Sequence, residues 1–132
     1  MILVDTSVWV HYFNGFQNWQ TDYLHDALGR ERVVMGDLIL MEVLQGFRSQ
    51  RDYLAAKEHL SVLECHSLCN LELAIEGAEH YRSLRGKGIT VRKTIDVLIG
   101  TWCIANSISL LHNDRDFDPM VEHLALPVII QT

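Results

Sequence analysis

The chain has 132 residues, of which 48% are hydrophobic, so residues 1–132 can bury one sizeable core and are expected to form a single domain. No apolar run approaches the length of a transmembrane helix, and residues 1–4 meet the polar Asp5 without the regions of a signal peptide, which predicts a cytoplasmic protein without membrane contact. The formal net charge of −6 argues at first against a nucleic-acid partner, but five of the eleven basic residues fall between Arg82 and Lys93, and local charge matters more than the total.

The first half of the chain alternates short apolar runs with segments of helical periodicity. The run at 1–4 suits a buried parallel strand, and Asp5 falls at its carboxyl end. Ser7 or Thr6 is expected to cap the first helix. The expected elements are a strand at 1–4, helices at 8–14 and 19–28, a strand at 32–35, a helix capped by Asp37 that runs to 47, a helix at 51–60 and a weak strand at 61–64.

The second half contains the longest helical pattern and the most apolar one. The expected elements are a helix at 70–84 before the break at 86–88, a helix capped by Thr94 that runs to 104, a strand at 108–112, a polar loop at 113–119 and a last strand at 127–130. The helix that Thr94 opens is apolar almost all round, which predicts a place deep in the core or at a subunit contact. Strands that alternate with helices predict an α/β fold whose parallel sheet is covered on both faces.

Five acidic residues stand where the expected strands and helices begin or end: Asp5, Glu42, Asp96, Asp114 and Asp116. Ligands of open parallel sheets bind beyond the carboxyl ends of the strands, and Asp5 and Asp114 each follow such an end. Asp96 lies near the start of its helix, and Glu42 projects from a helix that begins on the same side. Each acid alone is more often a cap or a surface charge. Carboxylates gathered at one edge repel one another unless a cation lies among them, so the joint arrangement predicts a metal site.

Four segments carry a resemblance that covers essentially the whole chain in order. They are Val4-Asp5-Thr6-Ser7-Val8-Trp9, residues 40–46 around Glu42, Thr94-Ile95-Asp96-Val97-Leu98-Ile99, and residues 111–117, which end in Asp114-Arg115-Asp116-Phe117. This ordered set is similar to the acidic motifs of PIN-domain ribonucleases, and more narrowly it resembles VapC-type toxins of bacterial toxin–antitoxin pairs. The resemblance implies a three-layer α/β/α fold with a central parallel sheet.

The resemblance also implies roles for individual residues. The catalytic and metal-binding residues that it implies are Asp5, Glu42, Asp96 and Asp114, with Asp116 as an auxiliary metal ligand. Ser7, or Thr6, takes the place of a polar helper beside Asp5. His112 departs from the pattern, because a Thr or Ser is common at that position, and this leaves the hydrogen-bonding role of the position open.

The RNA hydrolysis that the resemblance implies agrees with the chemistry of clustered acids, which suits the hydrolysis of a phosphodiester. One or two Mg²⁺ or Mn²⁺ ions held by carboxylates would stabilise charge on the phosphate and lower the pKa of a bound water, so no protein nucleophile is needed. Cleavage of this kind should leave a 5′-phosphate and a 3′-hydroxyl, and a single-stranded or looped RNA is the expected substrate. The residues expected to hold the RNA are Ser7, Arg85, Arg92 and Lys93, with other cations of the 82–93 segment and Arg48 or Arg51. Alone, however, that basic segment equally suits a solvated helix end.

The partners follow from the resemblance and not from the residues themselves. A small antitoxin protein is expected to bind the chain, block its cleft and tether the pair to promoter DNA, so that DNA is contacted only through the antitoxin. A homodimer is the expected assembly.

A metal-free nuclease is one alternative, in which two histidines act as acid and base. His112 lies next to the expected site, but nothing in the sequence places His11 beside it, and the carboxylates would be unexplained. A haloacid-dehalogenase-like phosphatase would need an Asp where Ser7 stands, and the acids and lysine of a receiver domain cannot be assigned. A non-catalytic PIN-like module that binds RNA or protein is the alternative function. Loss of one of the acids would be its signature.

The cysteines support neither a disulfide framework nor a zinc site. Cys65, His66 and Cys69 lack a clear fourth zinc ligand, and no CxxC pair is present. All three cysteines, including Cys103, are expected to be reduced thiols in or near the core.

Overall fold

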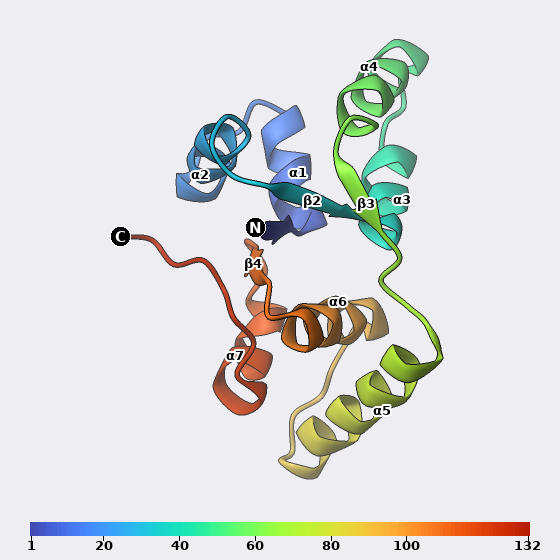
Figure 1. The fold of residues 1–132 in the computed structure, drawn as a ribbon, viewed down its shortest axis with the longest axis vertical. Coiled ribbons are helices and arrows are strands. Elements are labelled where there is room, and N and C mark those ends of the chain that lie inside the picture. Colours follow the sequence, from blue (N-terminus) through green and yellow to red (C-terminus); the bar gives the residue numbers. More distant parts are fainter.

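A single parallel sheet forms the centre of the molecule (Figure 1). The computed structural model describes all 132 residues. The strands are β1 (Ile2–Val4), β2 (Val33–Gly36), β3 (Glu64–His66) and β4 (Ser109–Leu111), and they pair in parallel in the order β3-β2-β1-β4. The α/β prediction with a parallel sheet is confirmed.

Helices cover both faces of this sheet. The helices are α1 (Thr6–Phe13), α2 (Trp19–Ala27), α3 (Asp37–Gln45), α4 (Gln50–Leu60), α5 (Leu71–Gly86), α6 (Thr94–Asn106) and α7 (Asp118–Leu124), with a short 3₁₀ turn, η1 (Arg115–Phe117). Crossovers between parallel strands are right-handed, so the step from β1 to β2 to β3 puts α1 to α4 on one face, and the return to β4 puts α5 and α6 on the other. Contacts of α1 with α2 and α3, and of α5 with α6 and α7, agree with these layers. The three-layer prediction is therefore confirmed.

The sheet brings the first and last parts of the chain to one edge. β1 is fully buried between β2 and β4, as expected of a continuous apolar run in a central strand. Val4 pairs with Leu111, and the backbone N–H of Asp5 donates a hydrogen bond to the carbonyl of Leu111 (2.9 Å). The chain therefore leaves β1 and β4 at the same place.

Three expected helix caps differ from the observed ones. The residue that caps α1 is Asp5, not Thr6 or Ser7, because its carboxylate accepts a hydrogen bond from the N–H of Ser7. Lys93 holds the N-cap position of α6, so Thr94 is the first helical residue. Asp37 is likewise the first residue of α3, where its Oδ1 accepts hydrogen bonds from the N–H groups of Leu38 (2.8 Å) and Leu68 (3.1 Å).

Two expected strands and one loop were placed wrongly. Residues 61–63 close α4, and the strand begins only at Glu64. The segment 127–130 makes a single bridge, from Val128 to Leu110, instead of a strand. The polar loop expected at 113–119 contains η1 and the start of α7, whose first turn includes Pro119, a position where proline is well tolerated.

The core contains 25 buried apolar residues, and α6 lies within it as predicted. Cys103 on that helix is buried, but Cys65 and Cys69 are exposed, so the expectation of core thiols was right only for Cys103. The exposed pair lies on or beside β3, an edge strand with one open side, which explains why these thiols are not covered. None of the helices combines the length and the apolarity that a bilayer span requires.

Gly36 packs against the core, which makes it sensitive to substitution. A Cβ atom at Gly36 would stand 2.7 Å from Cγ of Leu68, a fully buried residue. Gly36→Ala should therefore lower the free energy of unfolding by about 1–3 kcal/mol, the usual cost of overpacking. Gly86→Ala is the matched control, because no atom lies within 4 Å of its Cβ position at the end of α5. Urea denaturation compares the two variants, and equal midpoints would show that Leu68 moves aside without cost.

Candidate metal centre

Asp5 stands where β1 ends and α1 begins, and it is held from two directions. Its Oδ2 accepts hydrogen bonds from the backbone N–H (3.0 Å) and the hydroxyl (2.6 Å) of Ser7. Oγ of Ser7 accepts a hydrogen bond from the backbone N–H of Asn113 (3.0 Å), in the loop after β4. Asp5 is only 4% exposed. The carboxylate is therefore fixed both by α1 and by the loop that carries Asp114.

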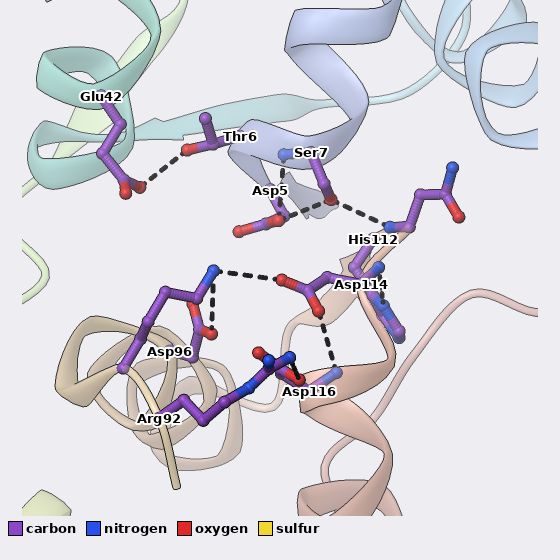
Figure 2. A network of polar contacts seen from close by, with 11 residues as sticks. Asp5, Thr6, Ser7, Glu42, Arg92, Asp96, His112, Asp114 and Asp116 are labelled. Carbon is purple, nitrogen blue, oxygen red and sulfur yellow. Dashed lines mark hydrogen bonds and ion pairs between the residues drawn. The ribbon is translucent and has the colours of Figure 1, made fainter.

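Three further carboxylates converge beside Asp5. Asp96 lies in the first turn of α6, Asp114 caps η1, and Asp116 lies within η1. One carboxylate oxygen from each lies within 4.8 Å of the others. Figure 2 shows these three side chains facing one another, with Asp5 just above them in the view. We call Asp96, Asp114 and Asp116 the acid cluster.

Glu42 occupies a separate position. It is partly exposed on α3, and its Oε1 accepts a hydrogen bond from the hydroxyl of Thr6 (2.8 Å). Figure 2 shows this pair at the upper left, away from Asp114 and Asp116. The structure thus brings Glu42 to the same end of the sheet through Thr6, but not into the acid cluster.

Two cations from the segment before α6 lie against the acid cluster. Nζ of Lys93 is 3.2 Å from Oδ2 of Asp114 and 3.4 Å from Oδ2 of Asp96. The guanidinium of Arg92 contacts Oδ1 of Asp116 at 2.8 Å. The predicted basic segment therefore reaches the predicted acids through these two residues.

Burial dominates the electrostatics of the centre. It raises the pKa of Asp96 to about 6, against the opposing charge of Lys93 and with support from the negative charges of Asp5 and Asp114. Burial likewise raises the pKa of Asp5, although the hydrogen bonds from Ser7 lower it. It also raises the pKa of Asp114, but the N–H of Asp116 and the Lys93 ammonium outweigh burial, so the net pKa lies below its usual value. Ionised Asp5 and Asp96 are therefore costly unless positive charge is added.

The donor set fits a hard divalent cation. Oδ2 of Asp96 is buried and accepts no hydrogen bond. Oxygens bound to one octahedral Mg²⁺ at about 2.1 Å lie about 3–4 Å apart, so the carboxylates, now within 4.8 Å of one another, would have to rotate closer together to share one ion. Carboxylate oxygens are also the ligands that Mg²⁺ and Mn²⁺ prefer. The acid cluster is therefore suited to hold a metal ion, with Asp5 directly beside it.

The structure shows the hydrogen bond that His112 makes, a role that the sequence left open. Its Nδ1 accepts a hydrogen bond from the backbone N–H of Asp114 (3.2 Å), and its ring packs on Phe117 with the ring centroids 5.0 Å apart. A ring nitrogen is therefore the hydrogen-bond acceptor at this position. Nδ1 must be unprotonated to accept this bond, which places the neutral ring's proton on Nε2.

Two contributions to the site were missed from the sequence. The Asn113 bond to Ser7 is made by a backbone N–H, so no side-chain pattern signals it. Arg115 lies beside Arg92, Asp96 and Asp116 in the lining of one small recess, because η1 turns the chain back towards α6. The arginine inside the Asp114-Arg115-Asp116 motif was the available signal.

Other residues considered for the site make no hydrogen bond or ion pair with its acids. The guanidinium of Arg85 is 5.8 Å from the centre of the Tyr81 ring, and Arg85 forms no ion pair with an acid of the centre. Arg48 is exposed between α3 and α4, and Arg51 is exposed in the first turn of α4. Nδ1 of His11 faces the side chains of Asn18 and Asn113, not His112, so the paired-histidine alternative gains no support.

In the metal-free protein, Asp96→Asn should stabilise the fold at neutral pH. The pKa of Asp96 is about 6 in the folded state and near 3.8 as a free side chain, so the unfolded state loses its proton first. The resulting penalty is absent below about pH 4, grows as the pH rises to about 6 and then stays at up to about 3 kcal/mol. Urea unfolding in EDTA should therefore show the Asn variant to be more stable at pH 8 and nearly equal to wild type at pH 4. Equal stability at both pH values would contradict the burial of a charged Asp96.

Comparison with proteins of known family agrees with this geometry. Residues 2–121 match the family model of the PIN domain. The chain is 32% identical over 123 residues to Ribonuclease VapC11 of Mycobacterium tuberculosis and to a VapC ribonuclease of Mycobacterium bovis. Each alignment covers 89% of this chain and 90% of the relative. The resemblance found in the sequence motifs is thereby confirmed.

Solved structures share the fold at lower identity. VapBC2 from Rickettsia felis, bound to a DNA fragment from its promoter, has a TM-score of 0.78 at 18% identity and full coverage of both chains. FitAcB from Neisseria gonorrhoeae has a TM-score of 0.72 at 16% identity, covering 98% of this chain and 97% of that one. Because the family model spans nearly the whole chain and the ribonuclease relatives exceed 30% identity, this chain is a PIN-domain protein of the VapC family.

Proposed function

We propose that this protein is a divalent-metal-dependent endoribonuclease and the toxin of a type II toxin–antitoxin pair. The observation that carries the proposal is the convergence of Asp96, Asp114 and Asp116 beside the buried Asp5, in a chain whose relatives are named ribonucleases. No serine, cysteine or histidine of the centre is arranged as a nucleophile with its base. The acids are therefore the chemically active groups.

The chain's own residues divide the work of the reaction. Asp96, Asp114 and Asp116 would hold the ion, and Asp5 adds negative charge at its side. A bound Mg²⁺ or Mn²⁺ ion supplies charge stabilisation at the scissile phosphate and an activated water. Ser7 and His112 hold Asp5 and Asp114 in place through the bonds described above, and Arg92 and Lys93 present positive charge for the RNA backbone. Asp5, Glu42, Asp96 and Asp114 are the proposed catalytic acids.

The partners of the pair belong to the same proposal. Structural relatives include VapBC complexes and a toxin–antitoxin complex from Klebsiella pneumoniae, two of them bound to DNA. By analogy, a small antitoxin binds this chain and links it to DNA, the chain forms a homodimer, and it acts in the cytoplasm. An antitoxin-sized reading frame next to the gene would support this part.

Cleavage is expected to require a divalent ion and to leave a 5′-phosphate. Purified protein should cut single-stranded RNA with Mg²⁺ or Mn²⁺ and stop in excess EDTA, because the acids have no other electrophile. The RNA products should ligate directly to an adaptor that demands a 5′-phosphate. Cleavage that persists in EDTA, or that yields 2′,3′-cyclic phosphates, would refute the mechanism. The Asp96→Asn protein, prepared in parallel, controls for contaminating nuclease.

A non-catalytic module that binds RNA or protein is the second candidate function. Loss of an acid would favour it, but Asp5, Glu42, Asp96 and Asp114 are all present. The burial of Asp5 and Asp96 beside other negative charges lowers the stability of the fold, and nothing offsets this cost if no cation is bound. The nuclease is therefore the better-supported function.

A further inference from the structure

Lys93 makes a contact that the proposed reaction does not by itself explain. Its ammonium group lies between two carboxylates of the acid cluster, 3.2 Å from Asp114 and 3.4 Å from Asp96. These are two of the three groups that the ion would use. An ammonium group held at these carboxylates repels a divalent ion bound at the same place, so the two cations compete.

The two sides of this contact differ in burial. The side chain of Asp96 is 7% exposed and is carried by the buried face of α6, whereas that of Lys93 is 51% exposed and stands before the first turn of that helix. Oδ2 of Asp96 accepts no hydrogen bond, so the Lys93 ammonium is its nearest compensating charge. Asp96 is therefore held in the core, and the exposed lysine is the partner that can leave.

We infer that Lys93 is a tethered counter-cation that competes with the metal ion and, once displaced, binds the RNA phosphate next to the ion. The inference rests on the proposed metal-dependent function and goes further by giving Lys93 two alternating partners. Before metal binds, Lys93 offsets the repulsion between Asp96 and Asp114. When the ion takes these carboxylates, the ammonium is released at the rim of the site, where a phosphate can accept it.

A coupling between metal and substrate follows from this exchange. The metal must displace Lys93, so its affinity is lower than the acids alone would give. A phosphate that binds the released ammonium favours the metal-bound form, and by linkage the RNA then strengthens metal binding. Arg92 contacts only Asp116 among these acids, so Lys93 is the residue on which this coupling depends.

The first test measures metal affinity without RNA. Lys93→Met should bind Mn²⁺ about tenfold more tightly than wild type in calorimetric titration, since the competing charge is gone. Lys93→Arg should stay near wild type, because it keeps the charge. Lys57→Met is the matched control: it removes the same charge from the exposed face of α4, and Lys57 forms no ion pair with these acids. Unchanged or weaker Mn²⁺ binding by Lys93→Met would overturn the inference.

The second test follows Lys93 in the unmodified protein, so it does not depend on a variant that folds. Reductive dimethylation read by mass spectrometry should proceed about threefold faster at Lys93 when Mg²⁺ is present, the effect of losing a partly exposed ion pair. Lys57 should react at the same rate with and without Mg²⁺, so it serves as the internal control. A Lys93 rate that Mg²⁺ leaves unchanged, or lowers, would show that the metal does not displace the ammonium.

The substrate half of the inference is tested by kinetics. At saturating Mn²⁺, Lys93→Met should raise the KM for RNA several-fold, and Lys93→Arg should restore it, because a phosphate contact needs only the charge. An unchanged KM in Lys93→Met would remove the role in RNA binding. Failure of the proposed function is distinguishable: wild type would then bind no Mn²⁺ at all, which overturns both proposals, whereas Mn²⁺ binding and cleavage with an unaffected Lys93 overturn only this one.

Discussion

Asp96→Asn is expected to lower the rate constant for RNA cleavage by about a thousandfold or more, equivalent to about 4 kcal/mol of lost transition-state stabilisation. Asparagine preserves the shape of the side chain in the first turn of α6, but it removes the charge of a buried carboxylate in the acid cluster. The variant should fold at least as well as wild type in the absence of metal, since the ionised Asp96 destabilises that state. Single-turnover cleavage of a labelled RNA measures the effect.

Asp52→Asn provides the control for this experiment. Asp52 lies in the first turn of α4, as Asp96 does in α6. It is exposed, and it is not a member of the acid cluster. Its substitution removes the same charge from an equivalent helix position and should leave the rate within about twofold of wild type. Circular dichroism confirms that each variant is folded. Wild-type cleavage by folded Asp96→Asn would remove Asp96 from the catalytic acids.

Asp114→Asn is expected to weaken Mn²⁺ binding by about a hundredfold, whereas Glu42→Gln should change it by less than about threefold. The difference follows from position, because Asp114 contributes an oxygen to the acid cluster and Glu42 is bonded to Thr6 outside it. Calorimetric titration without RNA gives both affinities. Cleavage assays of the same two proteins should show that both are impaired. Glu42 would then act on the RNA or on the attacking water, and not as a metal ligand in the acid cluster.

The outcome that would contradict this division is a large loss of Mn²⁺ affinity in Glu42→Gln. Such a loss would mean that α3 approaches the acid cluster when metal binds. Thermal unfolding offers an independent measure, because a ligand that binds only the folded state raises the melting temperature by mass action. Wild type and Glu42→Gln should respond to Mn²⁺ alike, and Asp114→Asn should respond much less.

Much of the fold was predictable because local patterns and tertiary burial agree. The apolar run before Asp5 reads as a central parallel strand, and the nearly all-apolar segment after Thr94 reads as a buried helix. The alternation of these elements predicts the layers. β3 was harder to place because it is an edge strand, and its residues Glu64 to His66 carry no apolar run.

The acids were predictable as a group, but their distances were not. Strand ends indicate that Asp5 and Asp114 share an edge, since parallel strands put their carboxyl ends together. Whether Glu42 enters the acid cluster depends on where α3 packs against α1, which no local pattern encodes. The same limit hid the bond from Asn113 to Ser7, because the two residues meet only after β1 and β4 have paired.

That late pairing sets an order of events during synthesis of the chain. The Ser7 that holds Asp5 is itself bonded to a residue 106 positions further on, and β4 is the last strand to be made. Chains emerge from the ribosome N-terminus first, at roughly 5–20 residues per second. β1 therefore waits for its second neighbour until β4 (Ser109–Leu111) has been made, long after β1 itself. A nascent chain that has not yet reached β4 and η1 lacks Asp114 and Asp116, so the acid cluster can form only after these late segments have been made.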